Sequence, residues 1–152
     1  MLQRIQTVYL FLATACLLLP FFFSIAKFDL GSASYLFTAT GLMKGGENLV
    51  AVPFQWIFLG LAGYTAAAIF MYGNRQLQMR MGRMNYLLLT ALIITLYFVT
   101  DGLPQKFEVP AAVIVSYGVG FFMPVAALAF VFLANRAIRS DENIIRSIDR
   151  LR

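Results

Sequence analysis

The sequence predicts an all-α membrane protein: a four-transmembrane-helix bundle with both termini in the cytoplasm and a small extracytoplasmic β-hairpin between helices 1 and 2. Composition is the first observation behind this prediction, because 61% of the 152 residues are hydrophobic and only 12% are charged. Soluble domains carry about 25% charged residues, so this chain has too few to cover a water-facing surface. The other two observations are four long uncharged runs and the alternating charge of the segments between them. We expect one membrane domain, residues 1–152.

The fourth uncharged run, residues 109–135, predicts the last span. A hydrocarbon core about 30 Å thick needs about 20 helical residues, and this run is longer than that. Pro124 removes one backbone hydrogen bond and predicts a bend. Small side chains recur at every fourth position and predict a groove in which a neighbouring helix packs closely; they are Ala112, Ser116 and Gly120.

The first and second runs predict two further spans. Residues 5–26 are uncharged and lie between Arg4 and Lys27. Residues 53–74 begin at Pro53, whose missing N–H costs nothing at a helix start. Small residues again share one face of the second helix and predict helix packing there: Gly60, Gly63 and Ala67.

The connection at residues 27–52 is the longest between spans and predicts the hairpin. Polar and apolar residues alternate over residues 33–40, which predicts a short strand. The segment KGGE at residues 44–47 predicts a tight turn, and residues 49–52 a returning strand. The alternative is a loop with an interfacial helix.

The third run, residues 84–100, is the shortest and spans a bilayer only with little tilt. We expect an inner loop at residues 75–83 and an outer loop at residues 101–108. The tail, residues 136–152, has an isoleucine stripe among basic residues. It predicts either a basic amphipathic helix or an extension of the fourth span.

The positions of the charges predict the orientation. Nine of the twelve Lys and Arg residues lie in the N-terminal segment, the loop at residues 75–83 and the tail. The other three, Lys27, Lys44 and Lys106, lie in segments that also carry acids. Because basic residues concentrate on the cytoplasmic side of membrane proteins, both termini are expected there.

Several chemistries are excluded by residue type. Histidine is absent and Cys16 is the only cysteine, so histidine-ligated metals, histidine-based catalytic triads and intramolecular disulfides are excluded. Ser24 and Lys27 would share a helix face as a nucleophile–base pair. Lys27 ends the span, however, and its ammonium is expected to reach the surface. We therefore expect no catalytic residue, metal or cofactor.

Arginines predicted at the inner helix ends are the candidate binding residues. Anionic lipids attract such residues by about 1 kcal/mol each near a membrane surface. We expect contacts with lipid headgroups or with a partner protein from Arg75, Arg80, Arg83, Arg136 and Arg139. Nucleic-acid binding is not expected, because three acidic residues dilute the charge of the tail.

Both ends of the chain carry a resemblance. The chain begins MLQRIQTVYL, and LANRAIRSDE at residues 133–142 leads to Arg146 and to DRLR at residues 149–152. These stretches resemble a bacterial four-span inner-membrane family catalogued as domain of unknown function 4293. The resemblance covers the whole length and implies an inner-membrane protein with both ends in the cytoplasm. The family has no established activity, so no site is transferred.

The expected function is that of an integral membrane protein without catalysis, a scaffold or accessory subunit packing against other membrane proteins or against itself. The uncharged spans, the small-residue faces and the tail favour it. The alternative is a small transporter or pore, alone or as a homo-oligomer, lined by Thr90, Thr95 and Ser116. A polar cavity through the bundle would favour this alternative, whereas a dry apolar centre would favour the scaffold.

Overall fold

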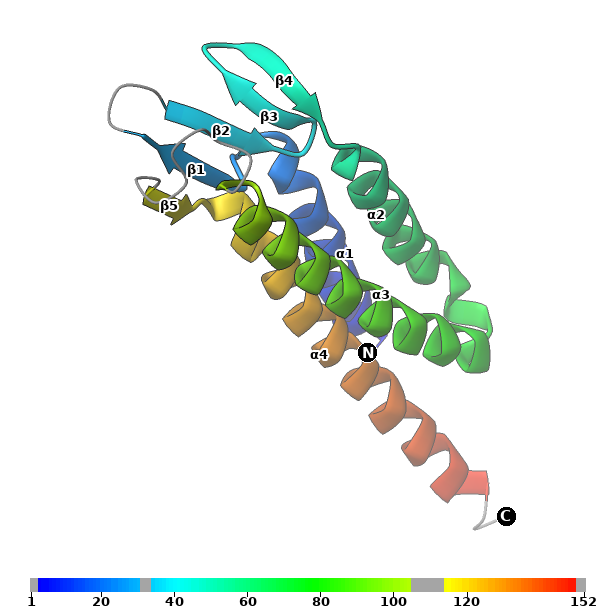
Figure 1. The fold of residues 1–152 in the computed structure, drawn as a ribbon. Coiled ribbons are helices and arrows are strands. Elements are labelled where there is room, and N and C mark those ends of the chain that lie inside the picture. The colour runs from blue at the N-terminus through cyan, green and yellow to red at the C-terminus, as the bar shows by residue number, and fades with distance from the viewer. Residues whose placement is uncertain (1–2, 31–33, 105–113, 150–152) are drawn as a thin grey trace.

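The computed structural model describes residues 3–30, 34–104 and 114–149, which form four α-helices and a five-stranded antiparallel sheet (Figure 1). The helical elements are α1 (Gln3–Leu18), η1 (Leu19–Phe21), α2 (Phe54–Phe70), η2 (Met71–Gly73), α3 (Arg75–Gly102) and α4 (Val119–Asp149), η denoting a 3-10 turn. The strands are β1 (Ala26–Asp29), β2 (Ser34–Thr38), β3 (Gly41–Lys44), β4 (Glu47–Ala51) and β5 (Ile114–Tyr117).

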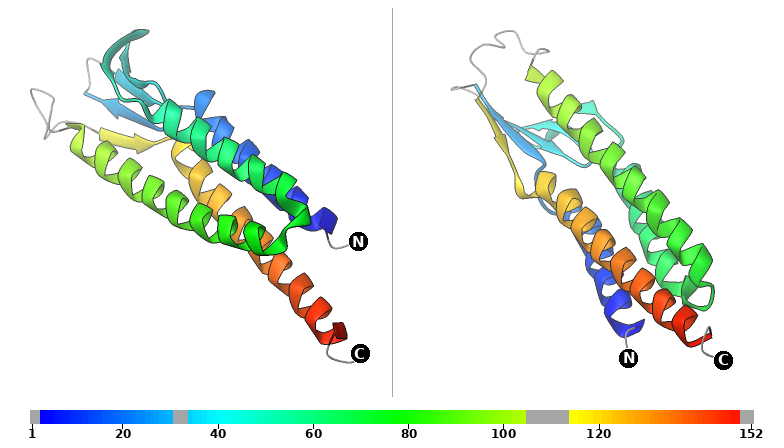
Figure 2. Two further views of the ribbon diagram at one scale, coloured as in Figure 1. Left: turned by 90° about the vertical axis from the view of Figure 1, so that its right-hand side faces the viewer. Right: turned by 90° about the horizontal axis from the view of Figure 1, so that it is seen from below.

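The helices form a bundle with a sheet at one end. The chain runs toward the sheet in α1 and α3 and away from it in α2 and α4 (Figure 1). Helix α1 packs against both α4 and α2, and α3 packs against α4 and, less extensively, against α2. The sheet lies at one end of the bundle, and α4 extends past the other helices at the opposite end (Figures 1 and 2). We call this opposite end, where α1 begins and α3 begins, the distal end.

The predicted small hairpin is wrong, because the strands form a sheet with the order β4-β3-β2-β1-β5. The tight turn between β3 and β4 is confirmed: Gly45 and Gly46 have φ angles of 59° and 97°, which suit glycine. Strand β1 was missed because it crosses the predicted boundary between the first span, residues 5–26, and the outer loop, residues 27–52. Its side chains alternate, with Phe28 buried between the more exposed Lys27 and Asp29.

Strand β5 is the second correction, and it makes the fold mixed α/β rather than all-α. Residues 114–117 fall within the run assigned to the fourth span, but they pair antiparallel with β1, with Ser116 opposite Lys27. Helix α4 begins only at Val119. Pairing with the edge of β1 supplies the backbone hydrogen bonds of this apolar segment, so it does not need a helix to satisfy them.

Helix bounds also differ from the expected spans. Helix α1 ends at Leu18, and Pro20 lies in the following 3-10 turn. The predicted inner loop at residues 75–83 is instead the start of α3, whose N-cap Asn74 accepts a hydrogen bond from the Leu77 N–H at 3.1 Å. Of the two alternatives for the tail, the structure shows an extension of α4 to Asp149.

An apolar core joins the sheet to the helices. Phe28 and Phe37 of the sheet are fully buried in the same cluster as Phe58 of α2 and Leu96 of α3. Three helical segments are long and apolar enough to cross a membrane: Phe54–Gly73, Gln76–Gly102 and Val119–Asp141. A shorter apolar helix runs over Ile5–Phe21.

Candidate functional site

Two adjoining cavities lie between α3 and α4 near the distal end. One has a volume of about 380 Å³ and the other about 480 Å³. Both are lined by Arg83, Asn135 and Arg139, so we treat them as one surface, the arginine groove. Its other lining residues are Gln76, Met79, Arg80, Tyr86 and Leu87 of α3 and Phe132 and Arg136 of α4.

Helical spacing explains how the groove forms. Its α3 residues recur at three- and four-residue steps from Gln76 to Leu87, which places them on one helix face. Its α4 residues recur in the same way from Phe132 to Arg139. Because the two helices are antiparallel, Leu87 lies toward Phe132 and Gln76 toward Arg139. The groove is therefore polar at the distal end and apolar toward the middle of the bundle.

Gly82 of α3 lies against Asn135, which lines both cavities of the groove. A Cβ built on Gly82 would overlap the side chain of Asn135, so only glycine lets this side chain lie directly on α3. Gly82 is buried and Asn135 is half-buried. The close approach of α3 and α4 at this point holds the arginines of both helices around the same space.

The groove is strongly positive. Four arginines line it, Arg80 and Arg83 on α3 and Arg136 and Arg139 on α4. Among the side chains that the structure describes, the only ion pair joins Lys27 and Asp29, far away in β1, with 3.1 Å between Nζ and Oδ2. The four guanidinium groups therefore keep donors available for an anion.

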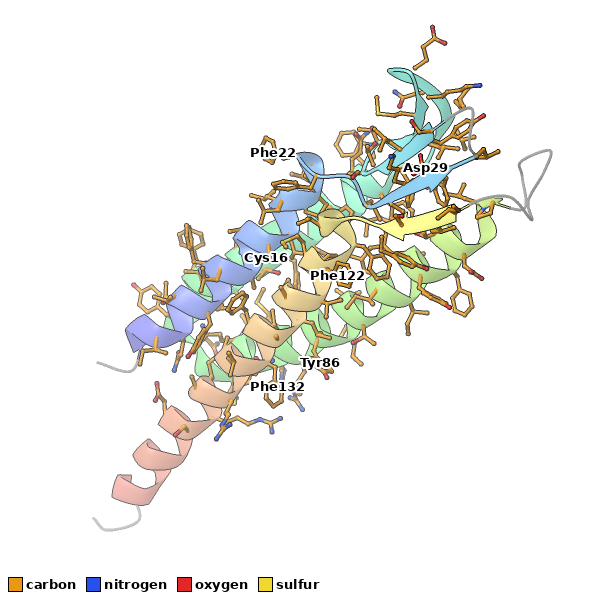
Figure 3. The ribbon with its side chains drawn as sticks, turned by 90° about the vertical axis from the view of Figure 1, so that its left-hand side faces the viewer. Cys16, Phe22, Asp29, Tyr86, Phe122 and Phe132 are labelled. Carbon is orange, nitrogen blue, oxygen red and sulfur yellow. The ribbon has the colours of Figure 1, made fainter. Side chains whose placement is uncertain are left out.

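The apolar part of the groove was missed in the sequence. The side chains of Tyr86, Leu87 and Phe132 are 41%, 62% and 54% exposed. Figure 3 labels Tyr86 and Phe132, which lie near each other on facing helices. The helical spacing from Arg83 to Tyr86 and from Phe132 to Arg136 was a usable signal, but hydropathy alone does not separate a groove from a lipid-facing surface.

Most of the predicted arginines gather in this groove. The structure brings together Arg80, Arg83, Arg136 and Arg139, as the charge pattern suggested. Arg75 is the first residue of α3, and its side chain lies outside the described part.

The two glycines of the predicted packing face of the second helix do not pack against the described part of the chain. Gly60 and Gly63 are exposed, and a Cβ built on either would meet open space. Ala67 is half-buried. Helix α2 therefore turns its glycines outward, away from α1.

The predicted packing face of the fourth helix does not exist as one helix face. Ser116 lies in β5 and is exposed, whereas Gly120 lies in the first turn of α4. Ala112 falls outside the described residues. Gly120 does make a close approach, but to backbone: its N–H donates to the Ser24 carbonyl at 3.0 Å.

The candidate catalytic and pore-lining residues are also placed differently. Neither Ser24 nor Lys27 lies on a helix, and Lys27 pairs with Asp29, so the expected helical dyad does not form. Thr90 and Thr95 donate their hydroxyl protons to the carbonyls of the preceding turn of α3, at 2.9 and 2.8 Å. Ser116, in the sheet, does not join them around a common axis.

Two buried hydrogen bonds between side chains connect helices in the described part of the chain. The Asn85 amide of α3 donates to the Thr65 hydroxyl of α2 at 2.9 Å, and this hydroxyl donates to the Leu61 carbonyl at 2.8 Å. Gln6 of α1 donates to the carboxylate of Asp141 of α4. Both contacts are explained by helix packing and leave the groove as the candidate site.

One comparison with known proteins gives a match. A family model described as a domain of unknown function (DUF4293) matches residues 2–151. No curated protein matches the chain, and no solved structure does.

Proposed function

Because the chain belongs to this family of unknown function, we propose its role from the structure: a multi-pass membrane protein without catalysis that acts as a scaffold or accessory subunit. It packs laterally against other membrane proteins or against a second copy of itself. The alternative, a small transporter or pore, needs a polar path through the bundle.

The proposed placement is a bacterial inner membrane crossed four times. Helices α2, α3 and α4 supply three spans by length and composition. Helix α1, about 25 Å long over its apolar residues, is the fourth, since it packs between α2 and α4 and buries Leu10, Ala13 and Leu17. The arginine-rich distal end, with both termini, faces the cytoplasm, and the sheet lies outside.

The apolar interior of the bundle carries the proposal. Most residues buried where α1, α2, α3 and α4 meet are apolar, among them Leu17, Phe58, Leu92, Leu96 and Val131. The buried ionisable side chain of the described part, Asp141, lies at the distal end and accepts from Gln6. Ion and proton pathways usually place ionisable groups inside the spans, because such groups are costly there and are retained for use. The described interior offers a packed core instead, which supports a structural role over conduction.

The outward face of α2 supports a lateral contact. Gly60 and Gly63 leave room for the backbone of another helix to approach closely, which is how helices associate in lipid. The exposed Ile57 and Leu59 on the same helix add apolar contact area. Within the chain, nothing described covers these two glycines.

Co-purification in a mild detergent, followed by mass spectrometry, tests the proposal. We expect a reproducible membrane-protein partner, or a second copy, to be recovered with the wild-type chain and lost with Gly60→Leu/Gly63→Leu. The matched control is Ala91→Leu, which enlarges an exposed side chain on α3 and should leave recovery unchanged.

Equal recovery with the glycine variant and the control would refute lateral packing through α2. Solute flux through liposomes that contain only the purified chain would instead establish the transporter or pore.

A further inference from the structure

We propose that the arginine groove binds one anionic phospholipid, with the phosphate on the arginines and an acyl chain along Tyr86, Leu87 and Phe132. This inference uses the proposed membrane placement of the bundle but not its lateral partner. The two proposals can therefore fail independently.

Charge complementarity selects the headgroup. Arg83 and Arg139 line both cavities of the groove, with Arg80 at the polar end and Arg136 at the apolar end. Guanidinium groups bind phosphate through two parallel N–H donors, which gives geometric fit as well as attraction. Because no carboxylate in the described part of the chain pairs with these arginines, an anion would meet unoccupied donors.

The apolar half of the groove selects a lipid over a soluble anion. The larger cavity, about 480 Å³, extends from Arg139 past Asn135 to Leu87 and Phe132. In the proposed membrane placement this surface faces lipid chains, so an acyl chain packs along it by van der Waals contact, whereas a soluble phosphate compound would not occupy it. Tyr86 lies between the two halves, where its ring suits the interface between headgroups and chains.

The position of the groove fits the orientation of a lipid in the bilayer. Its polar end is at the distal end of the bundle, and its apolar end points toward the middle of the proposed spans. Basic pockets between transmembrane helices on the cytoplasmic side bind anionic headgroups in this arrangement. Gly82 lets the Asn135 side chain, which lines the groove, lie directly on α3.

Native mass spectrometry of the full chain in mild detergent tests the proposal. The probes are dioleoyl phosphatidylglycerol and the zwitterionic dioleoyl phosphatidylcholine. We expect one phosphatidylglycerol to stay bound and phosphatidylcholine to be lost. Arg83→Gln/Arg139→Gln should weaken phosphatidylglycerol binding roughly thirtyfold, on the scale of lipid attraction per arginine.

Two variants separate the groove from general charge attraction. Lys27→Gln/Lys44→Gln removes the same charge from the sheet and should leave binding unchanged. Arg83→Lys/Arg139→Lys keeps the charge but loses the planar fork, and should weaken binding severalfold. Helicity and thermal unfolding by circular dichroism verify that each variant is folded. If the glutamine variant does not fold, the lysine variant still tests the proposal.

Three outcomes would overturn the proposal. The first is equal retention of the two lipids by the wild-type chain. The second is full phosphatidylglycerol binding by the lysine variant, which would show diffuse attraction rather than a site. The third is competition by glycerol phosphate at the same concentration as the lipid, which would assign the arginines to a soluble anion.

Discussion

Gln6, in the first turns of α1, donates a hydrogen bond to the carboxylate of Asp141 in α4, although 135 positions separate the two residues. Both side chains are buried, and the second carboxylate oxygen of Asp141 has no hydrogen-bond partner within the described part of the chain. The contact joins the first helix to the last at the distal end. It thereby holds α4 beside α1 where the arginine groove forms on the other side of α4.

Replacing Gln6 with Leu should lower the free energy of unfolding by about 1.5–3 kcal/mol, because it removes the donor from a buried charged acceptor. Asp141→Asn is the matched variant, since its amide oxygen still accepts from Gln6 and its charge is gone. Asp141→Asn should therefore lower the free energy of unfolding by less than Gln6→Leu does. Unfolding in detergent, followed by circular dichroism, measures both. A larger loss for Asp141→Asn would show that the carboxylate has another essential partner.

The Asn85–Thr65 contact predicts an order of stabilities. Thr65→Val keeps the shape of the side chain but leaves the buried Asn85 amide without its acceptor, which costs about 1–3 kcal/mol. Asn85→Leu removes both the amide and the unpartnered Asn85 oxygen, so it should cost less. Chemical denaturation of the two variants decides the order. The reverse order would mean that the amide contributes little to the packing of α2 on α3.

Two pairs of glycines should respond oppositely to alanine. A Cβ on Gly120 would lie 2.8 Å from the carbonyl oxygens of Phe23 and Ser24, and one on Gly118 would overlap the Ser24 carbonyl. Each substitution should destabilise the chain by about 1–3 kcal/mol, since backbone has to move. At Gly60 and Gly63 the space is open, and alanine should stabilise α2 by up to about 1 kcal/mol.

Thermal unfolding of the single variants compares these pairs. If Gly120→Ala unfolds at the same melting temperature as the wild type, the close approach of α4 to the segment after α1 is contradicted. The placement of β5 beside β1 would then be contradicted too.

Accessibility labelling tests the proposed orientation. In a Cys16→Ala background, Asn48→Cys lies on the exposed strand β4 and Ser140→Cys on the exposed distal part of α4. An impermeant maleimide should label Asn48→Cys in intact spheroplasts and Ser140→Cys only after permeabilisation. Labelling of both from the same side would refute an odd number of spans between them, and with it the proposed crossing by α2, α3 and α4.

The candidate site was predicted in part. Arg80, Arg83, Arg136 and Arg139 could be chosen because basic residues at span ends are visible in the sequence. That they face one groove depends on the continuation of α3 through residues 75–83, which Asn74 caps. The contribution of Asn135 depends on the contact with Gly82, which brings together positions far apart in the chain.

Composition and the local residue pattern predicted four helices, an arginine-rich end of the bundle and the tight turn at Gly45 and Gly46. These properties depend on composition and on neighbouring residues, which are read directly along the chain. Long-range contacts place residues 114–117 in the sheet beside β1 and set Gly118 and Gly120 against the backbone at Phe23 and Ser24, whereas the glycines of α2 face outward. An apolar run satisfies hydropathy equally well as helix or as strand, and the choice depends on whether a partner edge from elsewhere in the chain pairs with its backbone.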